Sequence, residues 1–117
     1  MRADLVWWDL DGAPETLAAL RAQLRADGVG PWPDVPGLRL KLWLSDPDQS
    51  RWGAVMVWQD ERPDAGLLPP NVAADLIGRP PDHRIRFEVE AVAEGTAAAV
   101  AGTMSGTALE GRSCTST

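Results

Sequence analysis

A stretch in the middle of the chain, residues 38–60, limits the fold more than any other part of the sequence; it reads LRLKLWLSDPDQSRWGAVMVWQD. Its first half alternates, with leucine at every even position and Arg39, Lys41 and Trp43 at odd ones. A period of two predicts a half-buried strand, and the second half, apolar on both parities, predicts a strand covered on both faces. The polar segment SDPDQSRW between them makes the pair a β-hairpin, with strands at about 38–45 and 52–59.

The flanking segments supply two helices and two more strands. Residues 4–10 are rich in Val, Leu and Trp and predict a first strand, and a helix is expected from Pro14 to a C-terminal Gly28. A short helix is expected between a capping Asn71 and Gly78. Residues 83–93 alternate and predict a half-buried last strand. The order β-α-β-β-α-β predicts an α+β, ferredoxin-like fold with a four-stranded antiparallel sheet and both helices on one face.

The other face of such a sheet is left bare, although the strand AVMVW is apolar on both sides. The simplest cover is a second copy of the chain, packed sheet on sheet in a symmetric homodimer. We assign residues 1–95 to this domain. Residues 96–117 are rich in Ala, Gly, Ser and Thr and predict a flexible tail, which could instead pack on the body or on a partner.

Composition excludes several classes of function. The net charge of −6 disfavours nucleic acid and anionic membranes as partners, because both require a basic surface. The sequence has no apolar run long enough for a transmembrane helix and no signal-peptide pattern at its start, so a cytoplasmic protein is expected. A single cysteine and a single histidine leave no cysteine or histidine metal site, and no phosphate-binding glycine motif is present, so neither metal nor cofactor is predicted.

Two segments, PGLRLKLWLSDPDQSRWGAVMVWQD and GRPPDHRIRFEVEAVAEG, resemble the YdhR-like monooxygenase family of the dimeric α+β barrel superfamily. The resemblance covers roughly residues 3–95 and implies a homodimeric barrel. It also implies a cofactor-independent monooxygenase acting on a small aromatic or polyketide-like substrate. Related oxidising enzymes surround an aromatic substrate with Tyr, Asn, Trp, Arg and His, whereas this chain has no Tyr, one Asn and one His.

The register of the hairpin decides which tryptophans could form a site. If Ser45 pairs with Trp52, then Trp43 faces Ala54, Lys41 faces Met56 and Arg39 faces Trp58, which gathers two cations among Trp and Met. Such a face could stack and neutralise a planar anion. A slip of one residue would instead place Trp52 and Trp58 with the leucine row against the helices. Both registers remain open, and packing in a core or dimer interface explains most of the tryptophans, with Trp43 the best exception.

The candidate residues follow from these patterns. We expect Lys41 to stabilise an anion and His83 or Asp9 to move a proton, so these three form the catalytic set. If Asp9 is buried, it needs a cation such as Lys41 or Arg86. The candidate substrate-binding residues are Trp7, Trp43, Trp58, Met56 and Arg86. The alternative without a functional role is a solvated Asp9 and a partly exposed His83. For the whole protein, the alternatives to an enzyme are a non-catalytic small-molecule-binding dimer and a structural dimer with a filled barrel.

Overall fold

The four strands form one antiparallel sheet in the computed structural model, which describes residues 1–97 and 106–110. They are β1 (Arg2–Asp9), β2 (Leu38–Asp46), β3 (Arg51–Trp58) and β4 (His83–Glu88), in the spatial order β2-β3-β1-β4. Hairpin partners β2 and β3 are adjacent, and β1 lies between β3 and β4. The predicted α+β class and antiparallel sheet are confirmed, and the strand order is compatible with a ferredoxin-like fold.

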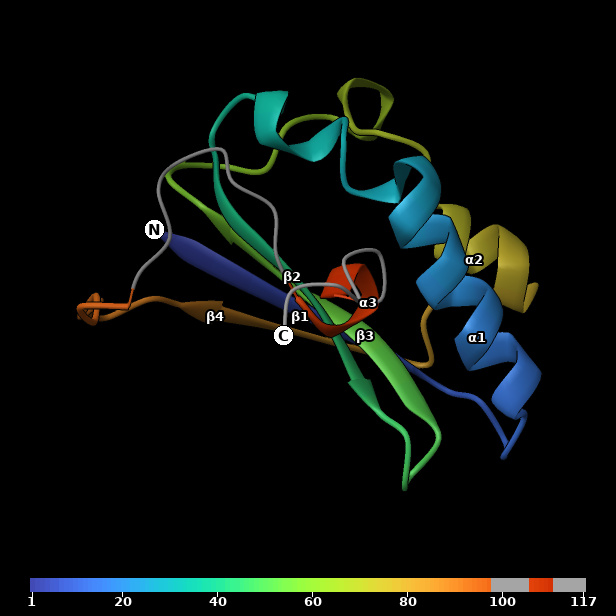
Figure 1. The fold of residues 1–117 in the computed structure, drawn as a ribbon. Helices are drawn as coiled ribbons and strands as arrows, with labels where there is room; N and C mark the ends of the chain where they lie inside the picture. Colours follow the sequence, from blue (N-terminus) through green and yellow to red (C-terminus); the bar gives the residue numbers. More distant parts are fainter. Residues whose placement is uncertain (98–105, 111–117) are drawn as a thin grey trace.

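Helices α1 (Pro14–Gln23) and α2 (Val72–Ile77) lie side by side on one side of the sheet, as Figure 1 shows. A π-helical turn, Leu24–Gly28, continues α1. The predicted ends of α2 are confirmed, because Asn71 Oδ1 accepts a hydrogen bond from Ala74 N at 3.1 Å and Gly78 has a left-handed φ of 93°. None of the helices in the described residues is long and apolar enough to cross a membrane.

A third short helix, α3 (Thr107–Glu110), lies in the segment predicted as a tail. It packs against α1 and the π-helical turn, and Arg25 Nη1 donates a hydrogen bond to Ala108 O at 3.2 Å. Part of the segment therefore lies on the body of the domain. The rest of the predicted tail, residues 98–105 and 111–117, is outside the described residues.

The hairpin adopts the first of the two registers considered: Ser45 pairs with Trp52, Trp43 with Ala54 and Lys41 with Met56. This register places Lys41 and Trp43 on the face covered by the helices. The leucine row does not pack against the helices, as the slipped register would require. The covered face carries the main buried side chains of the central strands, which are Val6, Trp8, Trp52, Ala54, Met56 and Trp58.

One expected pair is wrong, because Leu38 and not Arg39 lies opposite Trp58. The register shifts between Leu38 and Leu40, which is the geometry of a β-bulge. Trp58 is fully buried, so a guanidinium beside it would lose its hydration. The bulge turns Arg39 outward, where its Nη1 donates to Gln59 Oε1 at 3.0 Å.

The last strand is shorter than predicted, ending at Glu88 rather than near residue 93. Among the described residues it pairs with β1 alone, which begins at Arg2, and the final contact is a hydrogen bond from Val89 N to Met1 O at 2.9 Å. The pairing of β4 with β1 therefore ends near Val89. Every residue of β4 is exposed, which corrects the expectation of a half-buried strand.

The sheet face away from the helices, which we call the open face, is apolar. It carries alternate residues of all four strands, because antiparallel partners share a face. Its large exposed side chains are Leu40, Leu42, Leu44, Ile85 and Phe87, with exposed fractions of 41–54%.

Candidate functional site

A cavity of about 120 Å³ lies between the covered face of the sheet and the helices. The strands contribute apolar walls, and the floor is closed by Leu20 and Leu24 of α1 and its continuation. The connectors on either side of the hairpin complete it. Besides these two leucines, the lining includes Trp32, Lys41, Trp43, Met56, Arg62 and Arg84.

Lys41 stands out in this cavity because its ammonium contacts two indole rings. Its Nζ lies 3.3 Å from the ring centroid of Trp32 and 4.7 Å from that of Trp43. The two rings meet edge to face, with centroids 6.3 Å apart and an interplanar angle of 81°. Both distances are within the range of cation–π attraction, so the rings form two walls of a partial aromatic cage.

Burial, and to a smaller extent repulsion by the Arg62 guanidinium, lowers the pKa of Lys41 from 10.5 to about 7. Desolvation disfavours the charged form of an amine, and no carboxylate of the described residues lies within ion-pair distance to offset it. At neutral pH a substantial fraction of Lys41 is therefore a free amine. The other charged side chains lining the cavity, Arg62 and Arg84, are both cationic.

The predicted substrate-binding residues divide into two groups. Trp43 and Met56 line the cavity together with Lys41. Trp58 is fully buried in a core cluster with Trp32 and Met56 and does not reach the cavity. Arg86 also lies outside it.

Arg86 approaches a buried carboxylate instead. Its Nε is 3.7 Å from Asp4 Oδ1, and Asp4 is only 1% exposed. The same oxygen has no hydrogen-bond partner among the described residues. Arg86 therefore serves as the nearby cation that a buried carboxylate requires, rather than as a lining residue.

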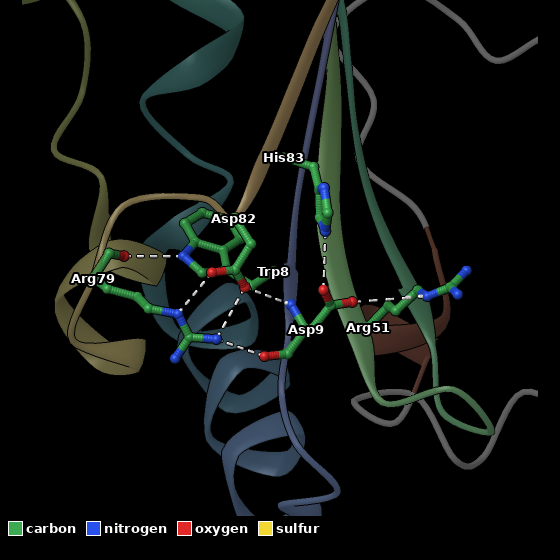
Figure 2. Close-up of polar contacts among 6 residues, drawn as sticks. All are labelled: Trp8, Asp9, Arg51, Arg79, Asp82 and His83. Carbon is green, nitrogen blue, oxygen red and sulfur yellow. Dashed lines mark hydrogen bonds and ion pairs between the residues drawn. The ribbon is translucent and has the colours of Figure 1, made fainter.

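The other predicted catalytic residues lie on the open face, so the sheet separates them from Lys41. His83 Nε2 is 2.9 Å from Asp9 Oδ2, and the His83 ring stacks on Trp7 with centroids 4.4 Å apart. Arg51 Nε lies 3.9 Å from the same carboxylate (Figure 2). Asp9 is half exposed and paired with His83 and Arg51, not with the expected Lys41 or Arg86.

A clamp of hydrogen bonds holds the His83–Asp9 pair in place (Figure 2). Arg79 donates to both oxygens of Asp82 at 3.0 and 2.9 Å, and its Nη2 donates to Asp9 O at 2.6 Å. Asp82 in turn accepts from Asp9 N at 2.8 Å, and Trp8 Nε1 donates to Arg79 O at 2.9 Å. This clamp joins the end of β1 to the start of β4.

A shallow hollow of about 280 Å³ lies on the open face beside this pair, lined by Leu5, Trp7, Leu44, Arg51 and Gly53 among others. A Cβ on Gly53 would overlap Val6 O and lie 2.8 Å from Trp7 Cβ. Only glycine therefore permits β1 and β3 to approach so closely at this point.

Trp32, Arg62 and Arg84 are the aromatic and charged residues near Lys41 in the cavity that the sequence analysis did not select. Trp32 lies between two prolines in the connector before β2, and a tryptophan in that setting was a usable signal, because a large ring is seldom left in water. The structure buries it at the start of a short 3₁₀ turn, Trp32–Asp34. The sequence around Arg62 and Arg84 gave no comparable indication. Arg62 lies in an irregular connector, and Arg84 is one of several charged residues that alternate with apolar ones along its strand.

The described residues contain no group of three His, Cys, Asp or Glu side chains close enough to hold a metal ion. In comparisons with known proteins, no family model and no curated protein matches this chain. Fold and site together define an α+β protein with a small, aromatic-lined, cationic cavity between its sheet and its helices.

Proposed function

We propose that this cavity binds a single aromatic ring carrying an acidic hydroxyl or enol, and that the protein is a cofactor-independent monooxygenase-like enzyme. The observation that carries the proposal is the contact of Lys41 with Trp32 and Trp43 in a cavity lined by two further cations. Indole faces suit a planar ligand, and the guanidinium groups of Arg62 and Arg84 suit its anion.

Lys41 can serve this chemistry in both of its protonation states. As the free amine it removes the proton from the ring hydroxyl or enol, and the resulting ammonium then lies beside the anion. The electron-rich anion reacts directly with dioxygen. When a ring CH₂ becomes C=O, one oxygen atom enters the product, the other leaves as water, and the substrate supplies all four electrons.

The size of the cavity favours a small substrate. A dry cavity of about 150 Å³ is enough to hold benzene in another protein, so about 120 Å³ matches one ring at most. A three-ring phenol would require the connector with Trp32 to move away. A monocyclic hydroquinone or enol is therefore a better candidate than a polycyclic substrate.

Oxygen uptake with a panel of monocyclic hydroquinones and cyclic enols tests this proposal. The variants Lys41→Met and Trp43→Ala should each lower the rate at least tenfold. Trp7→Ala and His83→Gln, on the opposite face of the sheet, serve as matched controls and should retain the wild-type rate. Uptake that is unchanged in both cavity variants would rule out this site.

A second candidate function is non-catalytic binding of a small aromatic molecule. It is favoured by the close contact of Lys41 with Trp32, because an amine that already covers the indole face leaves less room for a reacting substrate. A ligand that raises the thermal midpoint with the logarithm of its concentration above Kd, without turnover, would support this candidate.

We also propose that two copies of the chain pack their open faces together and so form a dimeric α+β barrel. Five large apolar side chains stay 41–54% exposed on this face, and monomeric proteins rarely expose a contiguous apolar patch of this kind. A two-fold axis through the sheet would cover these side chains with the same set from the second copy.

A further inference from the structure

The sequence contains a single lysine, Lys41, against ten arginines. The two residue types are not equivalent, because the guanidinium of arginine stays charged in proteins whereas a buried lysine readily loses its proton. The one side-chain amine that can become a neutral nucleophile is therefore placed inside the cavity. The positive charges outside it are carried by arginine side chains.

The surroundings of Lys41 favour the neutral amine. Cation–π attraction from the two indole rings favours the ammonium, but the other charged groups lining the cavity, Arg62 and Arg84, are positive and disfavour it. No carboxylate among the described residues pairs with it. Desolvation and Arg62 both lower its pKa, which supports the same conclusion.

We propose that Lys41 is a nucleophile that forms a reversible imine with a small aromatic aldehyde or ketone bound in this cavity. The indole rings provide faces for the ring of the ligand, and the cavity has room for one such ring. This reaction shares its cavity with the proposed oxygenase but needs neither oxygen nor a phenolic proton, so each can fail without the other.

The chemistry balances within the amine and the carbonyl compound. The Nζ lone pair forms a bond to the carbonyl carbon while the C=O π pair moves to oxygen, which takes up a proton as nitrogen loses one. The carbinolamine then loses its hydroxyl with a second proton from nitrogen as water, leaving C=N. The guanidinium groups of Arg62 and Arg84 favour the alkoxide formed in the first step.

Reductive trapping tests the inference. The folded protein is incubated with benzaldehyde and sodium cyanoborohydride at pH 7 and cleaved after arginine, and the benzyl adduct is quantified on the peptide of residues 40–51, which contains Lys41. The α-amine of Met1 serves as an internal reference. The same reaction is repeated on protein unfolded in guanidinium chloride.

Lys41 should be labelled at least about tenfold faster, relative to Met1, in the folded than in the unfolded protein. In the unfolded chain its pKa returns to about 10.4 and almost all of it is protonated at pH 7. Equal or slower labelling in the folded state would overturn the inference. The Lys41→Arg variant should show label on Met1 alone.

Two further comparisons test the role of the cavity. A three-ring aldehyde, 9-anthraldehyde, should label Met1 but leave Lys41 at least tenfold less labelled than benzaldehyde does. Trp7→Ala, on the open face, should leave labelling of Lys41 unchanged, whereas Trp43→Leu should slow it. Equal labelling of Lys41 by both aldehydes would show that the reaction takes place outside the cavity.

Discussion

Burial of the Lys41 amine has a thermodynamic consequence that depends on pH. Its folded pKa of about 7 lies below its ordinary value of 10.5, so between these two values the unfolded chain binds more protons than the folded protein. The contribution of Lys41 to stability therefore rises with pH from 7 to 10.5. Below pH 7 the folded protein bears the full cost of burying the charged ammonium.

Replacement of Lys41 by Met should remove this penalty. We expect Lys41→Met to raise the free energy of unfolding at pH 6 by about 1–3 kcal/mol. Each unit of pKa shift corresponds to about 1.4 kcal/mol of burial cost, and the cation–π attraction lost with the ammonium offsets part of that cost. The gain should shrink as the pH approaches 10. Guanidinium unfolding at pH 6 and pH 9 measures it, with Arg39→Met at the bulge as a control. A variant less stable than wild type at pH 6 would contradict the expectation.

Gly53 is the second residue whose surroundings allow a sharp prediction. Gly53→Ala should lower stability by about 1–3 kcal/mol, because the added methyl group meets the backbone oxygen of Val6, which cannot move aside as a flexible side chain can. Gly66→Ala is the matched control, since nothing lies within 4 Å of the added methyl group. Thermal unfolding measures both, and equal midpoints would show that β1 and β3 separate without cost.

At the level of elements, the clamp between β1 and β4 determines how firmly the edge strand is held. The side-chain hydrogen bonds from Arg79 and the amide of Asp9 lower the pKa of Asp82 from 3.8 to about 2. A carboxylate with a lowered folded pKa stabilises the protein above its unfolded pKa. That contribution is lost as the pH falls from about 4 through 2.

Asp82→Asn should therefore lower stability at pH 7 and flatten its decline between pH 4 and pH 2. The amide protons of β4 should also exchange faster with solvent, because the start of the strand loses its anchor. Hydrogen exchange and acid titration of the circular dichroism signal check both effects. The control is Asp48→Asn in the exposed turn of the hairpin, and an equal effect of the two substitutions would show that the clamp adds nothing.

Sequence patterns correctly predicted those features of the helices and strands that depend on neighbouring residues. The cap at Asn71, the stop at Gly78 and the alternation of β2 depend on neighbouring residues, and the structure confirms them. The end of β4 was predicted wrongly because it depends on where β1 begins, more than eighty residues earlier. Periodicity also could not reveal which face of β2 the helices cover.

The candidate site was predictable only where it depends on neighbouring residues of one strand. The pairing of Lys41 with Trp43 on one face follows from the alternation of a single strand. Trp32 reaches the same amine from a connector, and no period links it to β2. His83 and Asp9 were each predicted to move a proton beside Lys41, but strand parity places both on the other face of the sheet, where they contact each other.

At the scale of the whole molecule, the open face governs the expected assembly. The proposed dimer predicts that Leu42→Glu, at the centre of the exposed leucine row, converts the protein to a monomer, because its charge would have to be buried against a second apolar sheet. Leu76→Glu on α2 is an equally exposed control that should leave the dimer intact. Sedimentation velocity at micromolar concentrations measures both, and a wild-type monomer at about 100 μM would rule out the proposal.

The bulge at Arg39 changes how β2 responds to mutation along its length. After the bulge, odd-numbered side chains face the helices and even-numbered ones the open face, but before it the rule is reversed, since Leu38 faces Trp58. In a saturation scan of residues 38–46, the alternation between tolerant and intolerant positions should therefore break at position 39. Leu38 should be as intolerant of polar replacement as Trp43. Deleting Arg39 would remove the bulge and leave Leu38 facing the core, in regular alternation with Lys41 and Trp43.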